Sequence, residues 1–141
     1  MVKTFKSSDD LSIKQGALYF LKILTDVSDQ VAAECAKYGA TQAVIDDLRK
    51  NTRGVNILAN YLVDLLDFMS KICKHNQGHA EFLSPMALSS LVLCLQSDKI
   101  ENKIFSMNCV MYLARTKENI TILANYDTFN LIITNLMRAY E

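Results

Sequence analysis

Apolar residues recur every three or four positions along most of the chain, which is the spacing of one face of an α-helix. The longest stripe contains Ile57, Leu58, Tyr61, Leu62, Leu65, Leu66, Met69 and Ile72. Two other long stripes are Leu11, Leu18, Leu21 and Leu24, and Ile104, Met107, Val110, Met111 and Leu113. The apolar runs at 91–95 and 131–133 also fall in windows of helical spacing. We therefore predict an all-α protein with no strands.

Polar and glycine-containing segments separate the stripes and predict where helices begin and end. Helix starts are expected at residues 7–10, at Ser84 followed by Pro85, and at Asp127 followed by Thr128. Gly39 fits a helix end, because glycine tolerates the left-handed backbone found there. Residues 51–54, Asn-Thr-Arg-Gly, give the clearest loop signal of the first half. Further breaks are expected at 97–98 and 116–119.

The order long helix, short helix, medium helix recurs along the chain. The long helices end near Leu24, Ile72 and Leu113, which are 48 and 41 residues apart. Late positions of the medium helices are Leu48, Leu95 and Leu136. A period in the forties built from three helices is typical of an α-solenoid. In such a fold each unit buries its apolar face against its neighbours.

The segment 110–120 resembles the junction between armadillo repeats. A long third helix ends there in Leu113 and Ala114, and an acidic residue and Asn119 lead into the next short helix. The segment 36–40 is similar to the Gly-Ala step that ends the first helix in that family. The resemblance implies one right-handed armadillo-type α-solenoid over 1–141. Units 28–75 and 76–117 are complete, while 10–27 and 118–141 are partial. HEAT repeats, which lack the short first helix, are the near alternative.

The armadillo resemblance also implies a function, namely non-catalytic protein binding by a scaffold or adaptor, with a co-chaperone-like domain as an alternative. In that family the third helices line a concave groove that holds a partner's extended segment or helix. The subfamily that carries nuclear import signals has a recurring Trp and Asn on these helices. Here the equivalent positions hold Tyr19, Asp67 and Asn108, and Ile23, Lys71 and Tyr112. Recognition of such signals is therefore not expected.

The groove is instead predicted to present a mixed-charge surface with tyrosine and arginine, which are favoured interface anchors. Its residues are Tyr19, Lys22, Asp64, Asp67, Lys71, Asn108, Tyr112 and Arg115. The structural alternative is that Tyr19 and Tyr112 only pack between repeats. For Lys71, four residues after Asp67, a simple ion pair is the alternative explanation.

The sequence also bears on three other kinds of interaction. The formal net charge of zero argues against electrostatic capture of nucleic acid. The densest basic cluster, Arg49, Lys50 and Arg53, is more typical of a solvated loop, with partner contact as the second interpretation. The last helix would expose Leu131, Ile132, Ile133 or Met137. That exposure indicates self-association through an uncapped end, or a longer array.

The candidate chemistry is sparse, and we predict neither enzyme activity nor a metal or cofactor. The nearest ligand group is Cys73, His75 and His79, with Cys94 beyond, but Asn-Gln-Gly at 76–78 separates the histidines. Adjacent carboxylates point in different directions on a helix. The pair at 9–10 is therefore interpreted as a helix cap and the pair at 46–47 as a solvated face.

The four cysteines are far apart in the sequence and occupy apolar helical positions. This pattern predicts reduced thiols in an intracellular protein. The N-terminus starts no apolar signal segment, and no apolar run approaches the ~20 residues that span a bilayer. The sequence thus predicts a cytoplasmic protein without membrane insertion.

Overall fold

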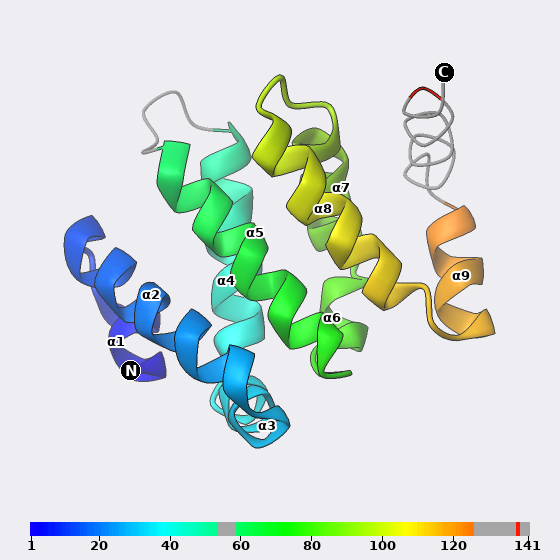
Figure 1. Cartoon of the computed structure of the whole chain (residues 1–141). Coiled ribbons are helices and arrows are strands. Elements are labelled where there is room, and N and C mark those ends of the chain that lie inside the picture. Colours follow the sequence, from blue (N-terminus) through cyan, green and yellow to red (C-terminus); the bar gives the residue numbers. More distant parts are fainter. Residues whose placement is uncertain (54–58, 126–137, 139–141) are drawn as a thin grey trace.

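The computed structural model describes residues 1–53, 59–125 and 138, and within these residues the regular secondary structure is entirely helical (Figure 1). The helices are α1 (Val2–Ser7), α2 (Leu11–Val27), α3 (Asp29–Lys37), α4 (Ala40–Arg53), α5 (Ala59–Lys74), α6 (His79–Phe82), α7 (Pro85–Leu95), α8 (Ile100–Leu113) and α9 (Lys117–Ala124). The described part contains no strand, which confirms the all-α prediction.

Short polar side chains start several helices, as the sequence predicts. The Asp10 carboxylate accepts hydrogen bonds from the backbone N–H groups of Ser12 and Ile13, at 2.9 and 3.3 Å. Ser84 caps α7, with Pro85 in the first turn. These caps satisfy N–H groups that have no partner inside the helix. Gly39, just after α3, has a φ of +86°, which confirms the predicted helix end.

Two layers of helices run through the molecule. Helices α2, α5 and α8 lie side by side, and we call them the front layer (blue, green and yellow in Figure 1). Helices α1, α4 and α7 pack in the same order behind them, and we call them the back layer. The short helices α3 and α6 each precede a back-layer helix. The long front-layer helices α2 and α5 are therefore each followed by a short helix and then by a medium back-layer helix, in the order that the sequence predicts.

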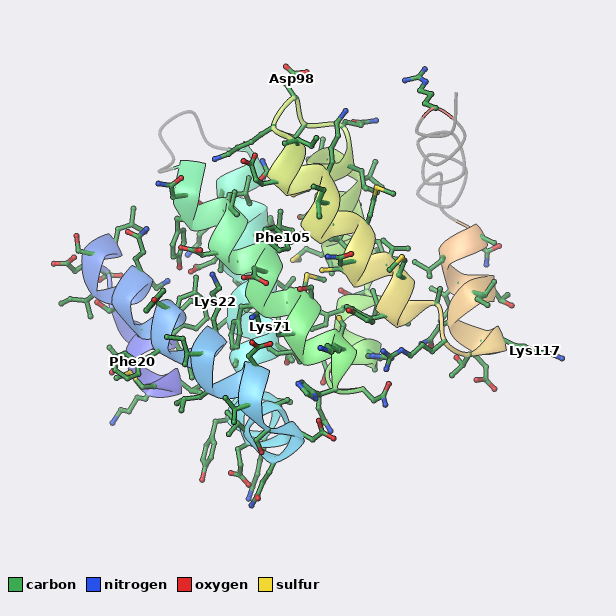
Figure 2. The ribbon with its side chains drawn as sticks, in the orientation of Figure 1. Phe20, Lys22, Lys71, Asp98, Phe105 and Lys117 are labelled. Atoms are coloured by element: carbon green, nitrogen blue, oxygen red, sulfur yellow. The ribbon has the colours of Figure 1, made fainter. Side chains whose placement is uncertain are left out.

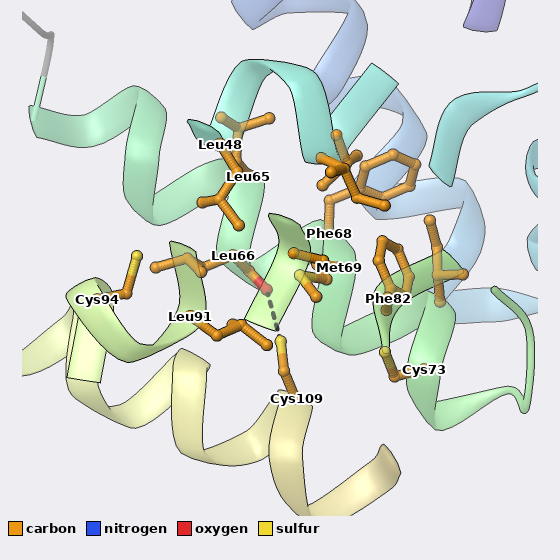
Figure 3. Close-up of a cluster of buried hydrophobic side chains, with 14 of the residues drawn as sticks. Leu48, Leu65, Leu66, Phe68, Met69, Cys73, Phe82, Leu91, Cys94 and Cys109 are labelled. Atoms are coloured by element: carbon orange, nitrogen blue, oxygen red, sulfur yellow. Dashed lines mark hydrogen bonds between the residues drawn. The ribbon is translucent and has the colours of Figure 1, made fainter. Parts of the chain in front are cut away.

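The apolar core fills the space between the two layers (Figure 3). Its largest fully buried side chains include Tyr61, Phe68 and Met69 of α5. Phe5 of α1 is also fully buried and meets the Phe68 ring edge-on, with the centroids 6.2 Å apart. The sequence analysis did not predict α1, although its Phe5 completes the core beside α2.

Three expectations are wrong. Residues 51–53 continue α4 instead of forming a loop, and the Asn51 side chain donates to the Asp47 carbonyl at 2.6 Å. Asp47 is buried and not solvated, because Lys14 and the Tyr61 hydroxyl both reach its carboxylate. The break at 116–119 is shorter than predicted, since Thr116 caps α9 at once. The predictions for 127–137 lie outside the described residues.

Candidate functional site

The predicted groove residues of α2 and α5 meet one another across the front layer (Figure 2). The Lys22 ammonium lies between two carboxylates, 2.9 Å from Asp64 Oδ1 and 3.0 Å from Asp67 Oδ2. Lys71 pairs in the opposite direction, 3.3 Å from Asp26 Oδ1. The ion pair predicted between Lys71 and Asp67 is thus replaced by two pairings between helices.

These paired charges are largely withdrawn from solvent. The exposed fractions of the Lys22, Asp64 and Asp67 side chains are 16%, 23% and 18%. Burial alone would lower the pKa of Lys22, but hydrogen bonds and the charges of Asp64 and Asp67 outweigh it and raise the pKa. The lysine therefore stays charged, and most of its bonding capacity is used within the chain. These groups hold α2 against α5, which leaves them less available to a partner.

The predicted residues on α8 form a second group. The Arg115 guanidinium lies 5.0 Å from the centre of the Tyr112 ring, which is a cation–π geometry. Arg115 also donates to the Lys74 carbonyl and to Asn76 Oδ1, at 3.0 and 2.7 Å. Tyr112 and Asn108 are half-buried. Tyr112 therefore packs within the fold, as the structural alternative proposed, while keeping part of its ring accessible.

Tyr19 lies on α2, one turn before Lys22, and the basic cluster lies on α4. Tyr19 is 59% exposed on α2. Arg49 and Lys50 are exposed on α4, and the Arg49 guanidinium donates to the Met86 sulfur at 3.6 Å. Arg53 is the last residue of α4, so the basic cluster ends a helix instead of forming a loop.

The Cys and His candidates contribute to the contacts between helices. His79 Nε2 lies 3.0 Å from the Cys73 carbonyl oxygen, and Asn119 Nδ2 lies 3.4 Å from His79 Nδ1. His75 pairs with Asp29. Among the described residues, no group of three or more His, Cys, Asp or Glu converges as metal ligands. Burial raises the pKa of the Cys94 thiol to about 12, which suppresses the thiolate that nucleophilic chemistry needs.

An apolar stripe along α2 is a surface feature that the sequence pattern did not reveal. Its members share the side of α2 away from α5, where Phe20 is visible in Figure 2. Ile13, Phe20, Leu24 and Val27 are 50%, 55%, 43% and 81% exposed. Four such residues one or two turns apart form a continuous apolar strip. We call this strip, Ile13 to Val27, the α2 edge.

Three of the four equivalent positions lie on α5 and are fully buried, and the fourth, His75, is half-buried just after that helix. Tyr61, Phe68 and Ile72 lie 48 residues after Ile13, Phe20 and Leu24, and their exposed fractions are 1%, 0% and 0%. They are buried because α5 packs against α2, α3 and α4. The 48-residue offset found in the sequence could have revealed this equivalence. It could not have shown that one stripe is covered and the other is not.

An open hollow lies at the same end of the molecule, beside α1. It encloses about 610 Å³ and is lined by Met1, Val2, Lys3, Lys6, Ser7 and Tyr38. The Lys6 ammonium donates to the Tyr38 carbonyl at 3.1 Å across this region. Tyr38 itself is 60% exposed. This end of the fold therefore combines an apolar strip on α2 with an apolar hollow between α1 and α3.

Comparison with family models, with characterised proteins and with solved structures finds no match for this chain. None of the described helices combines the length and the hydropathy needed to cross a bilayer. The geometry of the chain's own residues is therefore the basis for a functional proposal.

Proposed function

We propose that this chain is a non-catalytic protein-interaction module, an armadillo-type scaffold that docks an apolar partner surface on the α2 edge. The observation that carries this proposal is the contrast between Phe20, 55% exposed, and its repeat equivalent Phe68, fully buried. The recurring order of helices and the two layers support the solenoid architecture. The four buried free cysteines suit a reducing compartment, and we expect the cytoplasm.

The α2 edge has the chemistry of a helix-docking surface. Complete burial of a Phe, Leu or Ile side chain contributes roughly 1.5–3 kcal/mol. Phe20 and Leu24 lie one turn apart, so one partner helix can cover both. The charged groups of α2 that lie nearest α5 are already paired. Binding at the edge therefore requires no ion pair to break.

The outer face of the front layer is the second candidate surface. Tyr19 is exposed on α2, and the Tyr112–Arg115 pair lies at the C-terminal end of α8 and in the turn that follows it. A partner segment crossing α2, α5 and α8 would contact both tyrosines, as the armadillo resemblance implies. This face is second because Lys22, Asp64 and Asp67 are engaged with one another. A partner would have to compete for them.

Site-specific photo-crosslinking in cell extract distinguishes the two surfaces. A benzophenone amino acid replaces Phe20 on the α2 edge, Tyr112 on the front layer or Leu93 on the back layer. Leu93 is the control, since it is 44% exposed and lies on α7. We expect defined adducts from position 20 and none of them from position 93. Adducts from position 112 alone would favour the front layer. The same adducts from all three positions, or none, would contradict a docking function.

A further inference from the structure

A second exposed apolar stripe runs along α8, at the other end of the front layer. Ile100, Ile104 and Met111 are 65%, 48% and 58% exposed. Helical periodicity places this stripe opposite Cys109, whose thiol donates to the Leu66 carbonyl of α5 at 3.6 Å. The stripe therefore lies on the side of α8 away from α5. We call it the α8 edge.

Part of this face of α8 has a buried equivalent inside the chain. Met111 of the α8 edge and the half-buried Met107 beside it lie 41 residues after Ser70 and Leu66 of α5, which are 5% and 0% exposed, while Ile104 corresponds to the half-buried Val63. Leu66 is covered because α8 packs against α5. The α8 edge thus corresponds to the face that a following front-layer helix covers. The α2 edge corresponds to the face that a preceding one covers.

Building on the proposed docking function, we propose that the partner of the α2 edge is the α8 edge of a second copy of this chain. The front layer would then continue from one copy into the next. Its junction is already present twice within each chain, between α2 and α5 and between α5 and α8. Such a head-to-tail contact uses two different surfaces and therefore propagates, or closes into a ring.

The side chains at the proposed junction are matched in chemistry. At the α2–α5 junction, Lys22 contacts Asp64 and Asp67. The corresponding positions between copies are Met111 on α8 and, on α2 of the second copy, Gly16 and Tyr19. The Lys22 cation and both of its carboxylates are thus replaced together by uncharged residues. The positions of the Asp26–Lys71 pair become Arg115, which donates to the Lys74 carbonyl and Asn76 of its own chain, and Ile23. A lone replacement would leave a charge buried without a partner, which is strongly unfavourable.

The oligomeric state tests the proposal directly. Analytical ultracentrifugation of the wild type across a wide concentration range is expected to show a rising mean mass. Phe20→Glu and Met111→Glu each place a charge in one edge. Each is expected to remain monomeric, with an association constant lowered about thirtyfold or more, as for an interface hot spot. Leu93→Glu on the back layer is the control and should associate like the wild type.

Mixing the two variants identifies the geometry of the contact. Phe20→Glu keeps an intact α8 edge and Met111→Glu keeps an intact α2 edge. An equimolar mixture should therefore form a one-to-one dimer that grows no further. If Met111→Glu still associates alone, the contact is symmetric through α2, and the head-to-tail proposal is overturned. A wild type that stays monomeric at every concentration overturns it as well.

Cysteine crosslinking gives a second measurement that needs no destabilising charge. A Cβ atom added at Gly16 would have no neighbouring atom within 4 Å, so a cysteine side chain fits there. The four native cysteines are all buried. Under mild oxidation, Gly16→Cys mixed with Met111→Cys should give a disulfide-linked dimer, while Leu93→Cys mixed with Met111→Cys should not. Absence of the first product overturns the proposal. If position 20 still photo-crosslinks a different protein, only the identity of the partner fails and the docking function stands.

Discussion

The α2–α5 and α5–α8 junctions join neighbouring helices of one layer through different chemistry. At the α2–α5 junction, Lys22 bridges Asp64 and Asp67, and Lys71 pairs with Asp26. Ion pairs therefore join these two helices in addition to the apolar core. At the second, the Cys109 thiol lies against the Leu66 backbone within an apolar region (Figure 3). Side-by-side packing of helices in one layer therefore does not dictate the chemistry of the contact. It requires only that facing positions match.

This difference has a consequence for stability. Ion pairs that keep some solvent exposure weaken as salt concentration rises, whereas apolar burial does not. Burial of a large aliphatic side chain in a packed core is also worth more than a partly exposed ion pair. The α5–α8 junction should therefore contribute more to the free energy of unfolding, and the α2–α5 junction should be the one that salt and pH modulate.

The largest expected effect comes from opening the apolar junction. Leu66→Ala removes a fully buried side chain and leaves a cavity, which costs about 2–5 kcal/mol of the free energy of unfolding. Urea denaturation at low and high salt measures this loss, which should be the same in both. Val63→Ala, a half-buried position on the same helix, is the control and should cost less. Equal losses at the two positions would contradict the assigned core.

A smaller effect is expected at the ionic junction. Lys22→Met leaves Asp64 and Asp67 facing each other without their cation, and we expect a loss of about 0.5–2 kcal/mol. The loss should shrink at high salt. Because the folded-state pKa of Lys22 is raised, its stabilising effect is complete below its ordinary value of 10.5 and disappears as pH rises through the raised pKa. Urea denaturation against pH and salt measures both dependences.

The matched control for the ionic junction is Lys50→Met, which removes an exposed cation from α4. It should change the free energy of unfolding by less than Lys22→Met and show little dependence on salt. A loss at Lys22 that does not respond to salt would mean that its aliphatic chain, and not its charge, holds α2 against α5.

The smallest effect concerns reactivity and leaves stability untouched. Burial raises the pKa values of Cys35, Cys94 and Cys109, the second to about 12. At pH 8 a pKa of about 12 leaves about one Cys94 thiol in ten thousand ionised. Native protein should therefore react with Ellman's reagent far more slowly than protein unfolded in guanidinium. A thiol that reacts rapidly in the native state would show that part of the core opens readily.

Local sequence patterns predicted most of the helices and several of their boundaries. Asp10, Ser84 and Gly39 act as the sequence predicts because caps and turns depend on hydrogen bonds within a few residues. The prediction failed at residues 51–53, where the Asn51 side chain bonds back to the Asp47 carbonyl and α4 continues. Turn residues favour a loop only when no such contact holds the helix together.

The candidate site was predicted in composition but not in arrangement. Lys22, Asp64 and Asp67 were placed on one surface, and the structure brings them together. Their mutual pairing was not foreseen, since sequence spacing orders neighbours along one helix and not across two. Asp47 was expected in solvent for the same reason, whereas Lys14 and Tyr61 arrive from other helices and bury it.

The sequence by itself determined that the described chain is all-α, where several of its helices start, and which side of the longer helices is apolar. These properties follow from the backbone and from residues one turn apart. Only the tertiary structure decided which apolar sides are covered. Phe20 on α2 and Phe68 on α5 are both phenylalanines and lie 48 residues apart, yet the first is 55% exposed and the second is fully buried. Burial depends on a neighbour that is distant in the sequence. In the front layer α5 lies between α2 and α8, whereas, among the described helices, α2 has a front-layer neighbour on one side only, namely α5.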